Sequence, residues 1–267
     1  MVYLRCLYRI TALALWLVFA CLISVPYQFS GWEGNRKISR IVRLWARGVA
    51  RILNLKIKKY GEMPSLQRGL VVSNHLGYID IITHGTLFPS RFTSTTVIAR
   101  WPVIGWIISL TRPVWVDRGY KPASKKASRD FIKTMRRGMC LIVYPEGTST
   151  DGKGGILDFK STAFEAAVSG NMPVLPVLTL YKEKPGEKTV CWYGDMTLFP
   201  HIWEVLKRPS IEAELYFLDA IFPEGRSRKE LASFVHGRMS EEYEKLTRRA
   251  CERECRNDGA GIPANER

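Results

Sequence analysis

One short stretch constrains the fold of this chain more than any other. Residues 69–72 read Gly-Leu-Val-Val, an apolar and β-branched run typical of a buried strand. Residues 73–80 follow as Ser-Asn-His-Leu-Gly-Tyr-Ile-Asp, and the chain then runs without proline to Pro89, which predicts a helix. His75 therefore lies where a strand turns into a helix, at the carboxyl end of the strand. Open α/β sheets bind their ligands at such positions.

His75 and Asp80 form a candidate proton-transfer pair. They are five residues apart, so Asp80 can fold back onto the imidazole if the helix begins between them. A neutral imidazole can take a proton, and a carboxylate on its other nitrogen fixes the tautomer and stabilises the imidazolium. Gly77 relaxes the backbone at the turn. On this stretch alone, a helix cap beside a surface histidine remains an equal alternative.

Size and charge narrow the class of protein. The 267 residues suffice for one large domain or two small ones, and 46% hydrophobic residues support a real core. Forty Lys and Arg against 25 Asp and Glu give a net charge of +15, which favours an anionic partner such as nucleic acid, an acidic membrane or an acidic carrier protein. Six scattered cysteines contain no CxxC pair, which indicates free thiols in a reducing compartment and no zinc site.

The amino terminus predicts a membrane anchor. Residues 10–25 carry no charge, and as a helix they would be about 24 Å long, short of a hydrocarbon core of about 30 Å. Aromatic residues suited to an interface follow at Tyr27, Phe29 and Trp32. The segment can span the bilayer once, act as a signal peptide behind Arg5 and Arg9, or dip into one leaflet. We favour a retained anchor.

A second amphipathic segment follows the anchor. Its arginines recur at helical spacing and share one face, whereas apolar residues fill the other; the arginines are Arg36, Arg40, Arg43, Arg47 and Arg51. This pattern is typical of a helix lying on an anionic membrane, and the alternative is a packed helix with a solvated basic face. Two such helices in series predict a membrane-associated hairpin.

Strand and helix patterns alternate beyond residue 55, which predicts an α/β fold: a mixed β-sheet flanked by helices on both sides. Strands are expected at 55–60, 69–73, 95–99, 114–116, 139–144, 174–181, 190–193 and 211–218, and helices at 103–110, 124–137, 161–169 and from a capping box at 227–230 to about 249. Pro176 places its strand at an edge or a bulge. We expect anchoring helices at 1–54, one domain at 55–250 and a loose tail at 251–267.

Two further stretches carry candidate binding residues. Residues 144–152 read Tyr-Pro-Glu-Gly-Thr-Ser-Thr-Asp-Gly after a predicted strand, so amides around Gly147 and Thr148 could form an anion-binding nest and Glu146 could accept hydrogen bonds. Arg118 leaves the strand at 114–116 and could hold a phosphate with two hydrogen bonds. A polar turn and a salt bridge are the respective alternatives.

Together these stretches resemble four motifs of the lysophosphatidic acid acyltransferases, the glycerolipid acyltransferases of phospholipid synthesis. The matching segments are Asn74-His75 followed, after four intervening residues, by Asp80, then Trp-Val-Asp-Arg at 115–118, Tyr-Pro-Glu-Gly-Thr at 144–148 and Pro-Val-Leu-Pro-Val at 173–177, in the family's order and spacing. The family's fold, an α/β domain on a helical hairpin in one leaflet, agrees with the pattern read above.

The resemblance implies an enzyme that moves an acyl group to the hydroxyl of a lysolipid, with 1-acylglycerol-3-phosphate as the first acceptor to consider. His75 and Asp80 would be catalytic, and Asn74, Arg118, Glu146, Gly147 and Thr148 would bind substrate. The implied donor is an acyl thioester of coenzyme A or acyl carrier protein, with no cofactor and no metal. The implied partners are membrane lipids and the implied location is the cytoplasmic face of the inner membrane.

The chain departs from the family pattern at two positions. Arg112 stands where the second motif usually begins with glycine, and Ser149 stands where the third motif usually has an arginine associated with the acceptor's phosphate. The residues at 147–152, 192–196 and 200–203 look more like a branch that includes lyso-ornithine lipid acyltransferases. A lyso-ornithine lipid is therefore the alternative acceptor.

Two other classes of protein compete with an acyltransferase. A serine hydrolase could use His75 and Asp80, but the chain contains no Gly-x-Ser-x-Gly elbow. A basic module that binds membranes would explain the charge without any chemistry. Nucleic acid is disfavoured because basic strands interleaved with aromatic residues are missing.

Overall fold

The computed structural model describes residues 1–63, 68–87, 89–116, 121–183 and 186–259. Its centre is one sheet of seven strands in the order β1-β7-β6-β2-β5-β3-β4. Neighbouring strands pair in parallel except β6 and β7, which are antiparallel, so the sheet is mixed as predicted. The strands are β1 Leu55–Tyr60, β2 Gly69–Ser73, β3 Ser90–Thr95, β4 Val114–Val116, β5 Cys140–Val143, β6 Val174–Lys182 and β7 Ile211–Phe217.

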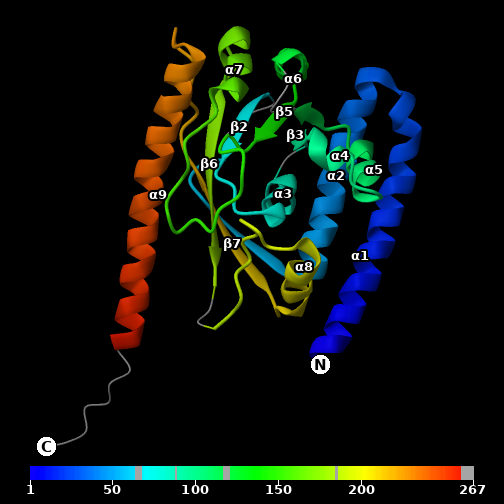
Figure 1. Ribbon diagram of the computed structural model, residues 1–267, viewed down its shortest axis with the longest axis vertical. Coiled ribbons are helices and arrows are strands. Elements are labelled where there is room, and N and C mark those ends of the chain that lie inside the picture. Colours follow the sequence, from blue (N-terminus) through cyan, green and yellow to red (C-terminus); the bar gives the residue numbers. More distant parts are fainter. Residues whose placement is uncertain (64–67, 88, 117–120, 184–185, 260–267) are drawn as a thin grey trace, which may run out of the picture.

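Helices cover both faces of the sheet (Figure 1). Alternate residues of β2 point to opposite faces: Leu70 and Val72 pack with Phe131 and Met239, whereas Val71 packs with Leu87. The helices are α1 Val2–Ser24, α2 Gly31–Leu53, α3 Tyr78–Gly85, α4 Thr96–Ala99, α5 Ile104–Leu110, α6 Lys121–Arg136, α7 Glu165–Gly170, α8 Leu198–Lys207 and α9 Arg228–Gly259, with 3-10 turns η1 Val25–Phe29 and η2 Ser161–Ala163. The fold class is confirmed.

Two of the expected strands are wrong. Within the segment 95–99, Thr95 ends β3 and the rest forms the short helix α4, because the Thr95 side chain accepts a hydrogen bond from the Val97 amide and caps the helix. The segment 190–193 is irregular, since the Val190 amide donates to the Glu183 carboxylate and the Trp192 amide donates to Leu76 O. These backbone amides are therefore bonded to a side chain and to a neighbouring loop, and they are not available for pairing with a β-strand.

Pro176 lies in the middle of the sheet, not at its edge, because β6 is flanked by β2 and β7. The regular pairing of β6 with β7 ends at Val177 opposite Phe217, and an isolated bridge joins Val174 to Ile221. Between these two pairings the strand after β7 has one more residue than β6, so the ladder bulges opposite Pro176. The bulge alternative explains how a residue without an N–H is tolerated there.

The first two helices form the predicted hairpin, but the first is longer than the uncharged run suggested. Residues Val2–Phe29 form 28 residues of helix that are long and apolar enough to cross a membrane. The helix includes Arg9, which is buried and donates to carbonyls near the carboxyl ends of α2 and α8, among them Ile52 O and Leu206 O. Internal hydrogen bonds therefore remove the cost of a charge at this position.

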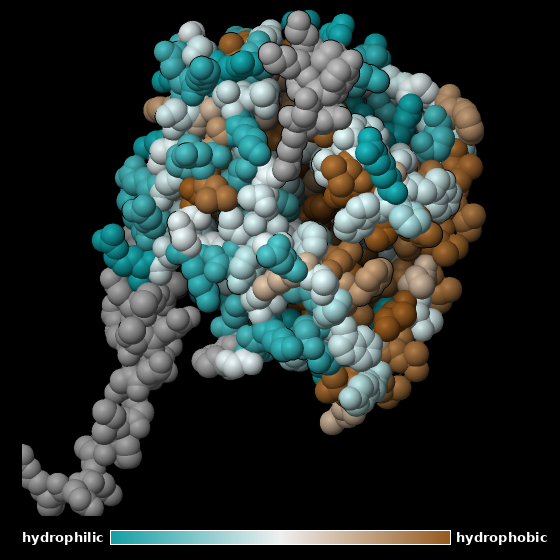
Figure 2. All heavy atoms as spheres, viewed as in Figure 1, coloured by the Kyte–Doolittle hydropathy of each residue, from teal (hydrophilic) through white to brown (hydrophobic). Residues whose placement is uncertain are grey.

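The outward face of α1 is a continuous apolar stripe of large side chains. Figure 2 shows hydrophobic residues gathered along the edge of the molecule where Figure 1 places α1. The stripe consists of Leu4, Leu7, Tyr8, Leu15, Val18, Phe19, Leu22 and Val25, all of them exposed. An apolar stripe of this length indicates a surface that meets lipid or another partner rather than water.

The second helix differs from the expectation that its basic face lies on a membrane. Arg36 donates to Arg137 O, Arg47 donates to Thr86 O, and Arg43 donates to both Thr86 O and Leu87 O, so three of the five arginines bind the α/β domain. The apolar side of α2 is also buried in protein. The interpretation of α2 as a helix packed within the protein therefore fits better than a helix lying on a membrane. The exposed apolar stripe makes α1 the better candidate for membrane contact.

The last helix begins at the predicted capping box. Ser227 N donates to Glu230 Oε2 over 2.8 Å, and Glu230 N donates to Ser227 Oγ over 3.4 Å. The helix α9 continues to Gly259, beyond residue 251 where we expected a loose tail to begin. The division into 1–54, 55–250 and 251–267 stays a prediction.

Candidate active site

The loop between β2 and α3 brings His75 and Asp80 together. His75 Nδ1 and Asp80 Oδ2 are 2.8 Å apart, with Asp80 fully buried and 22% of the His75 side chain exposed. Because the carboxylate accepts from Nδ1–H, the other ring nitrogen, Nε2, is left as the basic atom. Among the hydrogen bonds of the described residues, none occupies His75 Nε2.

The carboxylate of Asp80 both caps α3 and orients His75, so the two alternatives of the sequence analysis hold together. Asp80 Oδ2 accepts from the amides of Leu76 and Gly77 over 2.6 and 3.0 Å, and Oδ1 accepts from the Tyr181 hydroxyl over 2.7 Å. Burial alone would raise the pKa of Asp80, but the hydrogen bonds and the charge of His75 keep that pKa below its usual value. Asp80 therefore stays ionised in the protein interior.

Gly77 is required where the loop passes close to a second chain segment. Its φ of +147° is rarely adopted by other residues, and a Cβ built on it would lie 2.8 Å from Trp192 N. The Trp192 amide donates to Leu76 O over 2.8 Å, which fixes the segment after residue 190 against the His75 loop. A glycine at this position therefore permits the close packing that closes one side of the site.

Glu146 holds the backbone of His75 from the other side. Its Oε1 accepts from His75 N over 2.7 Å, and its Oε2 accepts from Leu157 N over 3.0 Å. The side chain is buried, and burial raises the pKa of Glu146. Both carboxylate oxygens are used by amides, so the contacts of Glu146 position the loop.

A buried aromatic wall stands behind the imidazole. The ring of Tyr144 stacks on His75 with centroids 4.2 Å apart, and its hydroxyl lies 2.9 Å from His84 Nδ1. His84 Nε2 in turn lies 3.1 Å from Thr179 Oγ1. Burial lowers the pKa of His84 to about 4, so this histidine is neutral near pH 7. His84 is therefore a packed structural residue.

Asn74 is used to join two strands. Its amide donates to Thr179 O over 2.9 Å and accepts from Thr179 N over 2.8 Å, and the side chain is buried. With these two bonds the side-chain amide of Asn74 takes the place of a backbone amide and extends the pairing of β2 with β6 beyond the end of β2. The placement gives Asn74 a role in fixing the His75 loop, and a contact with substrate stays a prediction.

The third motif forms a turn beside His75. Gly147 has a φ of +78°, and its amide donates to Tyr144 O over 3.1 Å, so this amide is not free for an oxyanion. Thr148 is exposed at the same turn, and its amide has no acceptor among the hydrogen bonds of the described residues. The nest predicted at Gly147 and Thr148 therefore narrows to the amide of Thr148.

Lys160 is a cationic group near the site that the sequence did not indicate. Arg118 lies outside the residues that the structure describes. Arg112 donates to Gly31 O over 2.8 Å, so its guanidinium fastens the helical hairpin. Ser149 donates to Trp192 O over 2.6 Å. Lys160 reaches the turn instead: a Cβ built on Gly147 would lie 2.5 Å from Lys160 Nζ.

Sequence reasoning missed Tyr181 and Lys160. Tyr181 lies near the end of β6, seven residues after Val174, where a side chain can reach the carboxyl edge that holds His75. Lys160 lies 13 residues after Gly147, and only the folding back of its segment, in which Lys160 N donates to Pro145 O, brings it to the turn. Position on the strand could have suggested Tyr181, whereas no local pattern indicates Lys160.

Comparisons with known proteins indicate the family of the domain that carries this site. A family model described as acyltransferase matches residues 54–179, which include β2, the His75 loop and the third motif. The chain is 26% identical over 247 residues to the lyso-ornithine lipid O-acyltransferase of Rhizobium meliloti, covering 86% of this chain and 84% of that one. It is 26% identical to the 1-acyl-sn-glycerol-3-phosphate acyltransferase of Neisseria meningitidis, covering 79% and 82%.

A solved structure shares the fold. The 1-acyl-sn-glycerophosphate acyltransferase of Thermotoga maritima matches with a TM-score of 0.66 and 20% identity, covering 92% of this chain and 95% of that one. The helical hairpin is therefore part of the shared architecture together with the mixed sheet. The four motifs, the family match over residues 54–179 and the two relatives lead to one conclusion: these residues form an acyltransferase domain, and the chain is an O-acyltransferase.

Proposed function

We propose that His75 is the general base that activates the hydroxyl of a lysolipid for attack on an acyl thioester. The observation that carries this proposal is the hydrogen bond from Nδ1 to buried Asp80, which leaves Nε2 basic and partly exposed. A base must lie within reach of the proton that it removes, and Nε2 is the ring nitrogen that the hydrogen bond to Asp80 leaves unused. Asp80 would orient the ring and stabilise the imidazolium.

The proposed reaction needs no nucleophile from the protein. Nε2 of His75 takes the hydroxyl proton as the acceptor oxygen bonds to the thioester carbonyl carbon. The tetrahedral intermediate then breaks its C–S bond, and the leaving thiolate takes the proton from His75, so the products are an ester and a thiol. The amide of Thr148 is our candidate donor to the oxyanion.

Coenzyme A and acyl carrier protein are both suitable carriers of the acyl group. The family takes its acyl group from a thioester, and among the described residues no group of His, Cys, Asp and Glu could hold a metal ion. The net charge of +15 supports acyl carrier protein, because that carrier is acidic and opposite charges speed association.

For the acceptor we propose a lyso-ornithine lipid first. Ser149 stands in the place of the family's phosphate-associated arginine, and its hydroxyl is bonded to Trp192 O. An acceptor without a phosphate does not need a positively charged residue at position 149. The relative from Rhizobium meliloti is named for that acceptor and covers most of both chains.

A phosphate acceptor, 1-acylglycerol-3-phosphate, is the second candidate. Lys160 Nζ lies against the turn at Gly147, so an ammonium group is available beside the third motif to bind the acceptor's anionic group. Arg118 is a further candidate for this contact. The relative from Neisseria meningitidis is named for a phosphate acceptor.

We propose that the enzyme sits on the cytoplasmic face of the inner membrane through α1. The exposed apolar stripe of α1 supports this placement, and its buried Arg9 ties the helix to the rest of the protein. A firmly packed anchor would hold His75 at a fixed distance from the lipid surface that supplies the acceptor.

Acyl transfer by the purified full-length chain tests the proposal. Labelled acyl thioester is supplied with each lysolipid in turn, and esters, free fatty acid and thiol are measured. We expect ester and thiol in equal amounts, with a higher kcat/KM for lyso-ornithine lipid. Free fatty acid without ester would instead indicate a hydrolase, and no turnover would indicate a binding module. A higher kcat/KM for 1-acylglycerol-3-phosphate would exchange the order of the two acceptors.

A further inference from the structure

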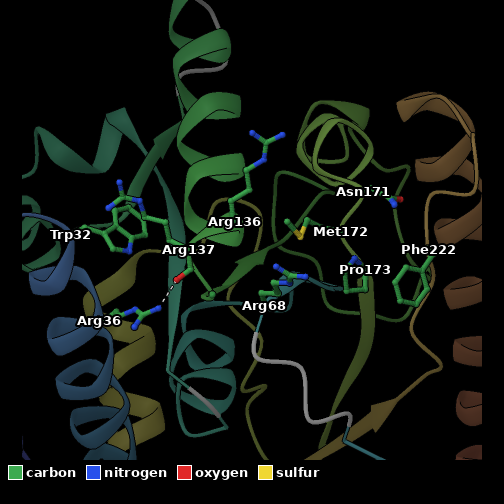
Figure 3. A pocket seen from close by; sticks show the side chains of 10 residues that line it. Trp32, Arg36, Arg68, Arg136, Arg137, Asn171, Met172, Pro173 and Phe222 are labelled. Carbon is green, nitrogen blue, oxygen red and sulfur yellow. Dashed lines mark hydrogen bonds between the residues drawn. The ribbon is translucent and has the colours of Figure 1, made fainter.

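A hollow lies at the edge of the sheet opposite the end that carries His75. Its volume is about 780 Å³, and it is lined by residues next to the amino ends of β2, β5 and β6. We call it the arginine pocket and define it by Trp32, Arg36, Arg68, Arg136, Arg137 and Phe222 (Figure 3).

The arginine pocket is separate from the acyl-transfer site. Arg68 immediately precedes β2, whereas His75 follows the end of that strand, so about 16 Å of strand separates the two. Arg136 ends α6 and Arg137 follows it, just before β5, which runs parallel to β2. All of these arginines therefore lie at the amino edge of the sheet.

Positive charge gathers in the pocket without a matching acid. No carboxylate lines it, and the ion pairs of the described residues include none of its four arginines. Arg36 donates to the peptide oxygen of Arg137, and the guanidinium of Arg137 lies 5.0 Å from the centre of the Trp32 ring. Arg68 and Arg136 have no hydrogen-bond partner within the described part of the chain. Like charges that line one pocket repel one another, and an anion bound between them reduces this repulsion.

The shape of the pocket limits the anion. Small-molecule sites commonly have volumes of about 300–1,000 Å³, and the arginine pocket falls in that range. In Figure 3, Trp32 and Phe222 stand at opposite sides, with Arg68 and Arg136 between them. Guanidinium groups match the geometry of phosphate oxygens, and the two rings offer apolar contact to the rest of a ligand.

We propose that the arginine pocket binds a phosphate group, carried either by a soluble small molecule or by the headgroup of a lipid. The lipid source is physically accessible because Trp32 and Arg36 belong to the first turns of α2, directly after the turn that joins it to the exposed apolar helix α1. In both cases the ligand occupies a site other than the one at His75.

Calorimetric titration of the full-length protein in neutral detergent with pyrophosphate tests the soluble source. The pocket variant combines Arg68→Gln with Arg136→Gln. The control combines Arg51→Gln with Lys58→Gln, which removes the same charge from exposed residues outside the pocket. We expect the wild type and the control to bind with dissociation constants within twofold, and the pocket variant to bind at least tenfold more weakly. The milder Arg68→Lys keeps the positive charge but cannot make the two parallel hydrogen bonds of a guanidinium to a phosphate, so it should weaken binding severalfold.

Sedimentation with phosphatidylcholine vesicles, with and without phosphatidylglycerol, tests the lipid source. If the ligand is a headgroup, the pocket variant loses the preference for anionic vesicles that wild type and control share. Equal behaviour of all three proteins in both assays would overturn the proposal. The KM for the lysolipid acceptor, measured in neutral micelles, should be the same for all three proteins. A raised KM in the pocket variant alone would also overturn the proposal of a separate site, because the arginines would then bind the acceptor itself.

Discussion

The hydroxyl of Tyr181 donates to Oδ1 of Asp80 over 2.7 Å, the oxygen that does not face His75. Burial raises the pKa of Tyr181 well above its usual value, so the phenol stays neutral and remains a donor. The carboxylate is thus held by the phenol on one oxygen and by His75 and two amides on the other. Tyr181 is therefore placed to position Asp80 within the proposed catalytic pair.

Replacing Tyr181→Phe should lower kcat about fivefold with little change in KM, because one hydrogen bond of about 1 kcal/mol to Asp80 is lost. The loss also raises the pKa of Asp80, so the acid side of the pH–rate profile should move to higher pH. Steady-state kinetics from pH 4 to 8 measure both. The control is Tyr60→Phe, whose hydroxyl bonds the carboxylate of Glu214 near the far edge of the sheet. A profile identical to wild type would show that the phenol does not support Asp80.

His84 should make the fold sensitive to acid. Its pKa in the folded protein is about 4, below the usual value of about 6.5, so the unfolded chain binds the proton more tightly. The contribution of neutral His84 to the free energy of unfolding is therefore fully present above pH 6.5 and is lost as the pH falls toward 4. The free energy of unfolding should decrease by about 2 kcal/mol between pH 7 and pH 5. Urea unfolding at several pH values measures this slope.

The variant His84→Gln removes the titrating group, so its stability should change less between pH 7 and pH 5 even if the variant is less stable throughout. A matched control is His236→Gln, whose ring lies on α9 away from this network. Equal slopes for wild type and His84→Gln would contradict the assignment of His84 as a buried neutral histidine.

Lys160 and the residue at position 149 should determine how strongly the enzyme prefers an acceptor that carries a phosphate. Lys160→Ala should raise the KM for 1-acylglycerol-3-phosphate about tenfold, because a charge-assisted hydrogen bond contributes about 1.5–3 kcal/mol. Ser149→Arg should lower that KM and leave lyso-ornithine lipid less affected. Kinetics with both acceptors measure the ratio, and Lys153→Ala on the same segment is the control. If Lys160→Ala leaves both KM values unchanged, the ammonium does not contact the acceptor.

The outward stripe of α1 should provide the membrane contact. Replacing Leu15, Val18 and Leu22 with serine should weaken binding to vesicles at least tenfold, since each apolar side chain contributes about 1.5–3 kcal/mol when buried. Deleting residues 1–53 is a poorer test, because Val49 and Leu53 belong to the core. Sedimentation measures binding, with exposed Met63 and Phe234 replaced by serine as the control. Unchanged binding of the triple variant would remove α1 as the anchor.

Periodicity and local motifs predicted the elements that carry the site. The run at 69–73 and the helix after it appear as β2 and α3, because a fully apolar β-branched run has few alternatives to a central strand. The pairing of His75 with Asp80 was predictable because both residues belong to one turn. The segment 95–99 was misread because Thr, Val and Ile favour strands, and only the cap at Thr95 reverses that preference.

Contacts between distant segments could not be predicted from the sequence. Glu146 reaches His75 N across 71 residues, and Tyr181 reaches Asp80 across 101. The basic face of α2 had the pattern of a membrane helix, but its partners are carbonyl groups at Thr86 and Leu87 that no periodicity reveals. Residues that act through tertiary contacts therefore came only from the structure.

The most direct test of the account is the turnover of His75→Ala. Single-turnover acyl transfer from a labelled thioester to the preferred lysolipid should be at least about 100-fold slower than in wild type, because general base catalysis contributes about 10²–10⁴. The melting temperature should stay within a few degrees, since the His75 side chain is partly exposed and its backbone bond to Glu146 remains. An ester-forming rate equal to that of wild type would contradict the assignment of His75 as the base.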